Sequence, residues 1–372
     1  MVASVTAAPR APEGDVASRP AVPLLEANLH PPARVSALVP RPRLAGQLLD
    51  RAGPPVVALV AGPGYGKTTL LSQWVDQERR PVAWLTLDEL DNDPAMLVAY
   101  LEAAFGRIHR LTATAGSMPP TDGGHPAHQA VPRLLDQLHR WRRPAVLVLD
   151  DAHRLVNATS LDVLTAILDH LPAGFRVAIA GRQEPCMPLA RWRAGRQVLD
   201  IGEADLALYI SETASLVAAA GARLTREELQ QLADRTEGWA AATYLAALAH
   251  VRSAGTDGGA PDIAGPDRFL SAYLASEVRA GLTPAEVDLL RRSAILETVT
   301  PQAAKALAGT DGSGSRLRAI ARRNLLVHEV GASGTTFRYH NLLREFLLGE
   351  LERDAPGTVR VLHGQASRWY AG

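Results

Sequence analysis

Hydrophobic residues in the first half of the chain gather in four short runs separated by amphipathic segments. Runs of this length, rich in Val, Leu, Ile and Ala, are typical of strands that are covered on both faces of a parallel sheet. The predicted strands are residues 56–60, 81–87, 145–151 and 176–181. Between them, apolar residues three and four apart predict helices beginning near residues 44, 67, 94, 131 and 160, with a loop at 111–129. Strands that alternate with helices up to about Asp200 predict an α/β fold with a mainly parallel sheet.

Beyond Ile201 the pattern changes to helices. They are predicted at 204–220, 225–236 and 238–251, and, after a Gly-, Asp- and Pro-rich linker at 253–266, near 269–280, 284–293, 301–308, 315–323 and 341–351. Two short segments, 325–330 and 335–340, flank a Gly-Ala-Ser-Gly turn and predict a hairpin. A helical cluster followed by a hairpin is typical of a winged helix. The predicted division is therefore a disordered leader at 1–23, an α/β domain at 24–200, an all-α helical subdomain at 201–252 and a winged-helix domain at 267–351.

The most specific motif, PVVALVAGPGYGKTTLLSQW at residues 55–74, joins the first predicted strand to a helix. A strand, a glycine-rich turn and a helix start in this order form the context of a phosphate-binding loop. Backbone N–H groups of such a loop surround the β-phosphate, Lys67 would contact the β- and γ-phosphates, and the Thr68 hydroxyl would bind Mg²⁺. The predicted nucleotide-binding residues here are Gly62, Gly64, Tyr65, Gly66, Lys67, Thr68 and Thr69. Ala61 replaces the first glycine of the general pattern and, being small, can still make the turn; a glycine-rich turn without a ligand is the alternative.

Charged residues follow two of the later strands. Asp150 and Asp151 end an apolar run 83 residues after Lys67, where a buried strand would direct them at the ligand crevice. Asp150 would complete the Mg²⁺ site with Thr68, and Asp151 would polarise the attacking water, unless both are structural. Arg182 closes the next strand and is predicted to reach a γ-phosphate, with an ordinary surface arginine as the alternative.

Composition narrows the classes of protein. The chain has 372 residues, 47% hydrophobic and 21% charged, with a formal net charge of zero, so no overall field attracts nucleic acid or a membrane. The lone Cys186 excludes an internal disulfide framework and fits the cytosol, and no apolar run reaches the roughly 18–20 residues of a membrane span. Residues 281–350 carry nine Lys/Arg against seven Asp/Glu, too little charge to predict a DNA-binding wing.

Two segments keep alternative interpretations. The acidic run at 88–93 is predicted to be a solvated loop. The extended, proline-rich stretch at 38–43 precedes the phosphate-loop strand, where it would be either an adenine-contacting segment or a solvated linker.

With these motifs together, the chain resembles the STAND class of P-loop ATPases, related to AAA+ proteins. Within that class it resembles the large ATP-binding LuxR-type regulators of the MalT-like group, over about residues 24–351. The resemblance is carried by AGPGYGKTTLLSQW, VAWLTLDELDND, VLVLDDAHRL, the arginine of IAGRQ, TEGWAAATYLAAL and FRYHNLLREFLL. It implies that Val39 and Arg41 lie on the adenine side, and that His340 contacts the β-phosphate of ADP, although a core or surface histidine is an equal alternative.

The resemblance also implies a mode of action. In such proteins the three domains close over ADP, whereas an inducer and ATP open them and the open form self-associates. The family continues, past the point where this chain ends, into helical sensor repeats and a C-terminal helix-turn-helix. Residues 352–372 resemble the start of the repeats, so DNA binding is expected only through a domain absent from this chain.

The sequence therefore predicts a cytoplasmic switch that binds ATP or ADP with Mg²⁺ and hydrolyses ATP slowly, without a membrane role and with an inducer that the residues do not identify. One alternative is a DNA-binding winged-helix regulator that holds nucleotide as a structural ligand. A metabolic kinase or ordinary turnover ATPase is the other.

Overall fold

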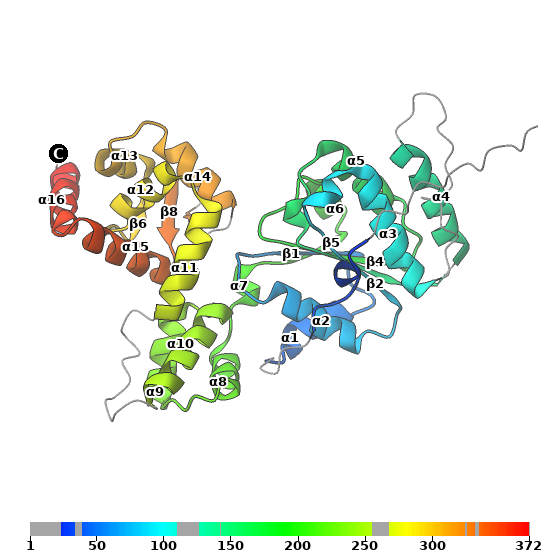
Figure 1. Cartoon of the computed structure of the whole chain (residues 1–372), viewed down its shortest axis with the longest axis horizontal. Coiled ribbons are helices and arrows are strands. Elements are labelled where there is room, and N and C mark those ends of the chain that lie inside the picture. Colours follow the sequence, from blue (N-terminus) through cyan, green and yellow to red (C-terminus); the bar gives the residue numbers. More distant parts are fainter. Residues whose placement is uncertain are drawn as a thin grey trace, which may run out of the picture.

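The computed structural model describes residues 24–33, 39–109, 126–141, 143–254, 268–323, 326–331 and 335–371. The predicted leader at 1–23 and residues 255–266 of the predicted linker lie outside the described residues. In Figure 1 an α/β part occupies one end of the longest axis, and the later helices with a small sheet occupy the other.

Within the described residues, five parallel strands form the larger sheet, in the order β2-β3-β4-β1-β5. They are β1 (Val56–Val60), β2 (Val82–Thr86), β3 (Val146–Asp150), β4 (Arg176–Gly181) and β5 (Val198–Ile201). The four predicted strands are confirmed. The edge strand β5 was not predicted, because only Ile201 of its residues is buried and a half-exposed strand of four residues leaves no continuous apolar run.

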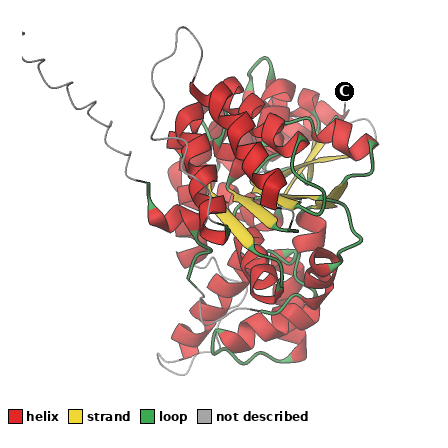
Figure 2. Ribbon diagram, turned by 90° about the vertical axis from the view of Figure 1, so that its right-hand side faces the viewer, coloured by secondary structure: helices red, strands yellow, loops and turns green. Residues whose placement is uncertain are grey.

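Helices cover both faces of this sheet (Figures 1 and 2). On one face lie α1 (Pro42–Leu49) and α2 (Lys67–Gln77), whose leucines share a core with Val148 of β3. On the other lie α3 (Pro94–Ile108), α4 (Pro126–Trp141), α5 (Ala158–Asp169) and α6 (Leu189–Ala194). Leu147 and Leu149 belong to that second core, as the alternation of side chains along a strand requires. The predicted doubly covered α/β fold is confirmed.

One predicted loop is partly wrong. The loop expected at 111–129 overlaps α4, which already begins at Pro126, and residues 110–125 lie outside the described residues. Proline is well tolerated in the first turn of a helix because its missing N–H would have no partner there. Pro126 therefore begins a helix, although proline was interpreted as a sign of a loop.

The middle of the chain forms four helices among the described residues: α7 (Glu203–Leu206), α8 (Ile210–Ala219), α9 (Arg226–Thr236) and α10 (Ala240–Ala254). The single helix predicted at 204–220 is wrong, because the chain leaves the helix at Ala207 and restarts after Tyr209. There the Leu208 N–H donates to Gly238 O at 2.8 Å, so a contact made in the folded chain overrides the local helical pattern. Thr225 and Glu228 form a capping box at the start of α9, whose position agrees with the helix predicted at 225–236.

The last part is a winged helix followed by one more helix. Its helices are α11 (Arg268–Gly281), α12 (Pro284–Ser293), α13 (Pro301–Ala308), α14 (Ser313–Arg322), α15 (Asn341–Asp354) and α16 (Thr358–Ala371). The strands β6 (Thr298–Val299), β7 (Val327–Val330) and β8 (Thr336–Tyr339) form an antiparallel sheet in the order β6-β8-β7. The predicted hairpin is thus confirmed, and the two-residue β6 was too short to predict.

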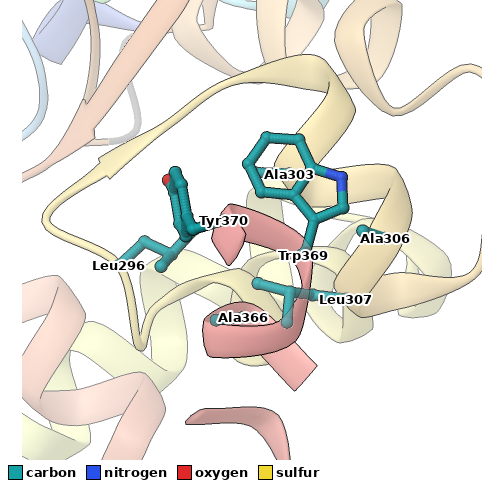
Figure 3. A pocket seen from close by; sticks show the side chains of 7 residues that line it. All are labelled: Leu296, Ala303, Ala306, Leu307, Ala366, Trp369 and Tyr370. Atoms are coloured by element: carbon teal, nitrogen blue, oxygen red, sulfur yellow. The ribbon is translucent and has the colours of Figure 1, made fainter. Parts of the chain in front are cut away.

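A small apolar pocket lies between α13 and α16, beneath Trp369 and Tyr370 (Figure 3). None of the predicted nucleotide-binding residues lines it. Among the helices that the structure describes, none is long and apolar enough to cross a membrane.

Candidate functional site

The loop between β1 and α2 has the backbone that its glycines predict. Gly64 and Gly66 have φ of +75° and +85°, in the left-handed region that favours glycine. A Cβ atom on Gly64 would lie 2.5 Å from the Cβ of Ala241, so this position also needs glycine for space. Ala61 is buried, and its N–H donates to Gly181 O at 3.3 Å. The loop therefore tolerates Ala61 at its first position.

Lys67 lies at the first turn of α2 and is only 7% exposed. Its Nζ donates to Ala61 O at 2.8 Å and to Gly62 O at 3.0 Å, so the ammonium is held inside the loop. Burial lowers the pKa of Lys67 to about 8, and the carboxylates of Asp151 and Asp150 partly oppose this shift. An ammonium held in such a loop is positioned to meet phosphate oxygens.

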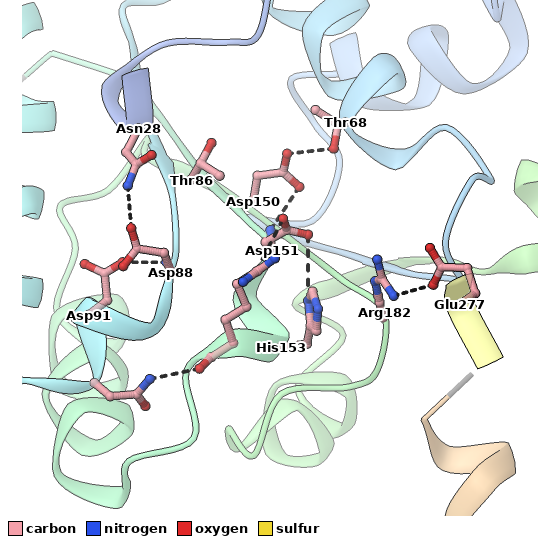
Figure 4. Close-up of polar contacts among 12 residues, drawn as sticks. Asn28, Thr68, Thr86, Asp88, Asp91, Asp150, Asp151, His153, Arg182 and Glu277 are labelled. Atoms are coloured by element: carbon pink, nitrogen blue, oxygen red, sulfur yellow. Dashed lines mark hydrogen bonds and ion pairs between the residues drawn. The ribbon is translucent and has the colours of Figure 1, made fainter. Parts of the chain in front are cut away.

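Thr68 and Asp150 meet at the carboxyl end of the sheet. The Thr68 Oγ1 donates to Asp150 Oδ2 at 2.7 Å (Figure 4). Asp150 ends β3 and is buried, which raises its pKa, while the Thr68 hydroxyl opposes that shift. A hydroxyl and a carboxylate oxygen at this separation can share one hard cation, because Mg²⁺ takes oxygen ligands and completes its shell with water and phosphate. The donor set fits the predicted magnesium.

Asp151 follows in a left-handed conformation, with φ of +55°. The oxygens of its carboxylate lie 3.8 Å from His153 Nδ1 and 3.8 Å from Arg154 Nε. Burial lowers the pKa of His153 to about 4, so the imidazole is neutral at pH 7. Asp151 and His153 point toward one another beside Asp150 in Figure 4.

The acidic segment after β2 is only partly the solvated loop that the sequence predicts, because Glu89, Leu90 and Asp93 are exposed whereas Asp91 is buried. It contains η2 (Glu89–Asn92), and Asp91 is fully buried, with a pKa raised to about 6 mainly by burial. The Asn92 Oδ1 accepts from the N–H groups of Val156 and Asn157, both at 2.8 Å. Its Nδ2 donates to Arg154 O at 3.0 Å. Asn92 therefore binds the loop that follows Asp151, and the buried Asp91 is the residue of this segment that the predicted solvation does not describe.

Arg182 follows β4, between the strands that carry Asp150 and the phosphate loop. Its Nη1 donates to Glu277 Oε2 of α11 at 2.8 Å, and the two side chains are 37% and 17% exposed. Figure 4 shows the guanidinium directed at Glu277, while Thr68 and Asp150 face each other. Arg182, which was predicted to contact the γ-phosphate, thus lies beside the site and forms an ion pair with the winged-helix part.

Trp239 connects the phosphate loop to the later helices. Its indole Nε1 donates to Pro63 O at 2.8 Å, and it is fully buried. Its ring centroid lies 6.4 Å from that of Tyr65, 5.8 Å from Tyr273 of α11 and 5.5 Å from His340. Two residues further on, the Ala241 N–H donates to Gly64 O at 3.0 Å. Two loop carbonyls are therefore bound by the start of α10.

His340 is buried against Trp239 at the start of α15. Its Nδ1 accepts from the Leu342 N–H at 3.2 Å, so Nε2 carries the proton and donates to Thr236 O at 3.1 Å. Burial lowers the pKa of His340. Both ring nitrogens are engaged within the protein, and a phosphate contact requires Nε2 to leave Thr236.

Val39 and Arg41 lie where the chain meets the helical subdomain. Val39 is buried against Leu208 and Leu216, and its carbonyl accepts from Gln73 Nε2 at 2.7 Å. Arg41 pairs with Glu212 of α8 at 3.2 Å and also donates to Leu206 O. Val39 is therefore buried among apolar side chains, whereas the guanidinium of Arg41 is bonded to α7 and α8.

Glu203 also reaches the phosphate loop, and sequence reasoning missed it. Its Oε1 accepts from the Gly62 N–H at 2.8 Å, and its Oε2 lies 3.3 Å from His328 Nδ1 of β7. No motif marks it, because it begins a four-residue helix after an unpredicted strand.

The structure thus brings Lys67, Thr68, Asp150 and Asp151 together, with Arg182 nearby. Thr69 follows in α2 beside Gly66. The residues that sequence reasoning missed are Asn92, Glu203, Tyr273 and Glu277, and it gave Trp239 no role.

Comparison with known proteins agrees with this architecture. Residues 43–180 match the AAA ATPase domain family, and residues 275–359 match the MalT winged helix domain family. The Walker-type ATPase of Pyrococcus abyssi has a similar fold, with a TM-score of 0.59 and 14% identity, covering 86% of this chain and 98% of that one.

Two curated relatives align with nearly the whole chain. The serine/threonine-protein kinase PknK of Mycobacterium tuberculosis is 28% identical over 376 residues, which is 97% of this chain and 34% of the kinase. The HTH-type transcriptional regulator MalT of Serratia proteamaculans is 28% identical over 361 residues, which is 94% of this chain and 39% of the regulator. The chain spans between a third and two fifths of the length of these relatives.

Proposed function

Because this chain is homologous to the MalT regulators and joins an AAA ATPase domain to a MalT winged helix domain, we propose that it is a nucleotide-binding control module of a transcription regulator. The observation that carries this proposal is the meeting of Lys67, Thr68 and Asp150 at the carboxyl end of the parallel sheet. We propose the domain division stated above, with the nucleotide-binding domain at 24–200, the helical subdomain at 201–252 and the winged helix at 267–351.

In the proposed site each residue has a separate task. The loop N–H groups from Gly64 to Thr68 surround the β-phosphate, and Lys67 neutralises charge on the β- and γ-phosphates. Thr68 and Asp150 would hold Mg²⁺, which when bound would neutralise charge on the phosphate oxygens. Asp151 accepts a hydrogen bond from the attacking water and so aligns it with the γ-phosphorus.

The proposed output is a change in domain arrangement rather than rapid turnover. Trp239 and Ala241 donate to two carbonyls of the phosphate loop, and Trp239 also packs against His340 and Tyr273 of the winged-helix part. A loop that is bonded to the helical subdomain cannot change its shape without disturbing these contacts. The arrangement therefore supports a STAND-type cycle in which the domains are closed with ADP and open with ATP. In this proposal an inducer of unknown chemistry promotes the opening, the open form self-associates, and the protein acts in the cytoplasm.

The two curated relatives support a control module for a further reason. One is named a protein kinase and the other a transcriptional regulator, yet both align with nearly all of this chain. Because the two relatives have such different outputs, the segment that they share with this chain is better explained as a regulatory unit than as a domain that catalyses a common reaction. The module is therefore proposed to hydrolyse ATP slowly, as a timer.

Titration with ADP and with a non-hydrolysable ATP analogue tests this proposal, with Mg²⁺ present and absent. The expected result is tight binding of both nucleotides that Lys67→Ala weakens by at least tenfold. A protein that binds neither nucleotide would contradict the proposal. Steady hydrolysis above about 1 s⁻¹ without an effector would favour an ordinary ATPase, and salt-dependent binding of duplex DNA would favour the DNA-binding winged helix.

A further inference from the structure

Two residues of α11 face the proposed nucleotide site from the winged-helix part. Tyr273 and Glu277 are four residues apart, so they lie on the same face of the helix. A Cβ on Gly64 of the phosphate loop would lie 3.2 Å from the Tyr273 hydroxyl, and Glu277 binds Arg182. Burial and the Glu277 carboxylate raise the pKa of Tyr273 to about 12, so the phenol stays protonated beside the carboxylate. One turn of α11 thus contacts both the phosphate loop and the arginine.

Glu277 presents to Arg182 the same chemistry that a phosphate would. A carboxylate and a phosphoryl group both offer oxygen acceptors that bind a guanidinium. Glu277 is 17% exposed and lies beside Tyr273, whose pKa its carboxylate helps to raise, so its carboxylate is largely withdrawn from solvent where it meets Arg182. Arg182 uses Nη1 for this bond, so its guanidinium is directed at Glu277 (Figure 4).

From this geometry we propose that Glu277 competes with the γ-phosphate of ATP for Arg182, so that engagement of Arg182 by the nucleotide releases α11 from the ATPase domain. The inference rests on the proposed function and specifies the regulation of the same site. ADP lacks the competing group and leaves the Arg182–Glu277 pair intact. ATP has to break the pair, and by thermodynamic reciprocity the pair weakens ATP binding by the same factor by which ATP weakens the pair.

The test compares the wild-type chain with Glu277→Gln, which keeps the shape of the side chain and removes its charge. The affinity for a non-hydrolysable ATP analogue is expected to rise about tenfold, because the analogue no longer displaces the carboxylate. The affinity for ADP is expected to stay within twofold of wild type. In the background of Arg182→Ala, Glu277→Gln is expected to have no effect on either affinity.

Glu345→Gln is the matched control. Glu345 of α15 pairs with Arg235 of α9 at 2.9 Å and so also joins the winged-helix part to the helical subdomain, but Arg235 is not among the residues predicted to bind nucleotide. This variant is expected to change neither affinity. Thermal unfolding of each variant verifies that the fold is kept.

The possible outcomes separate the two proposals. A lower affinity of Glu277→Gln for the ATP analogue would mean that Glu277 holds Arg182 ready for phosphate, and would overturn the competition. Equal changes for both nucleotides, or no change, would also overturn it while leaving nucleotide binding intact. If the wild-type chain binds neither nucleotide, the proposed function fails and the competition fails with it.

Discussion

Replacing Trp239 with phenylalanine would test whether the phosphate loop and the helical subdomain are energetically coupled. The change keeps a buried aromatic ring and removes the indole N–H that donates to Pro63 O at 2.8 Å. A hydrogen bond of this kind contributes about 1 kcal/mol net, and the smaller ring leaves a void in a fully buried site that costs about another 1 kcal/mol. The closed arrangement should therefore lose about 2 kcal/mol relative to the open one, which is roughly a thirtyfold shift in their ratio.

Trp74→Phe supplies the matched control for this substitution. Trp74 of α2 is also fully buried, but its Nε1 has no hydrogen-bond partner among the described residues. Its replacement leaves a similar void but breaks no hydrogen bond to the phosphate loop, so it should not change how the domains are arranged.

Sedimentation velocity with saturating ADP, together with urea unfolding, measures both effects. Trp239→Phe is expected to sediment as a mixture of compact and extended forms, and Trp74→Phe as the compact form only. If Trp239→Phe lost no more compactness than Trp74→Phe at equal loss of stability, the coupling through Trp239 would be refuted.

Three further predictions concern the site itself. Asp150→Asn should remove most of the Mg²⁺-dependent gain in affinity for the ATP analogue, at least tenfold, when titrations with and without EDTA are compared. Asn92→Ala should slow single-turnover ATP hydrolysis at least tenfold with ADP affinity unchanged, because the loop after Asp151 loses three hydrogen bonds that each contribute about 1 kcal/mol net; equal losses in binding and hydrolysis would contradict a positioning role. Because the pKa of Lys67 is lowered to about 8 in the folded chain, the unfolded chain binds more protons at this side chain between about pH 8 and pH 10.5. The free energy of unfolding should therefore rise with pH over this range, and it should rise less in Lys67→Met. Over the same range calorimetry should find ADP affinity falling, since the neutral amine no longer attracts phosphate.

Much of the α/β part could be predicted because its signals are local. The runs that form β1 to β4 are apolar and uninterrupted, and the carboxyl ends of parallel strands must meet at one edge of the sheet. Lys67, Thr68 and Asp150 each follow such a strand or its loop, so their meeting follows from the motif and its context. β5 was not predicted because it is a half-exposed edge strand that contains a charged residue.

The contacts between domains could not be predicted, since they depend on how distant elements pack. Arg182 and Glu277 are 95 positions apart, and Trp239 and Pro63 are 176 apart. No local pattern records which carboxylate an arginine will meet at such a separation. The role of Asn92 was missed for another reason. The sequence does not show whether a polar side chain binds backbone groups of a second loop or is solvated.

The proposed switch is tested most directly by the hydrodynamic radius of the wild-type chain at saturating ADP and at saturating non-hydrolysable ATP analogue, measured at low protein concentration so that self-association does not contribute. A compact particle with ADP and a larger radius with the ATP analogue is the predicted result. The same radius with both nucleotides, each shown to be bound, would contradict the claim that the γ-phosphate controls the arrangement of the domains.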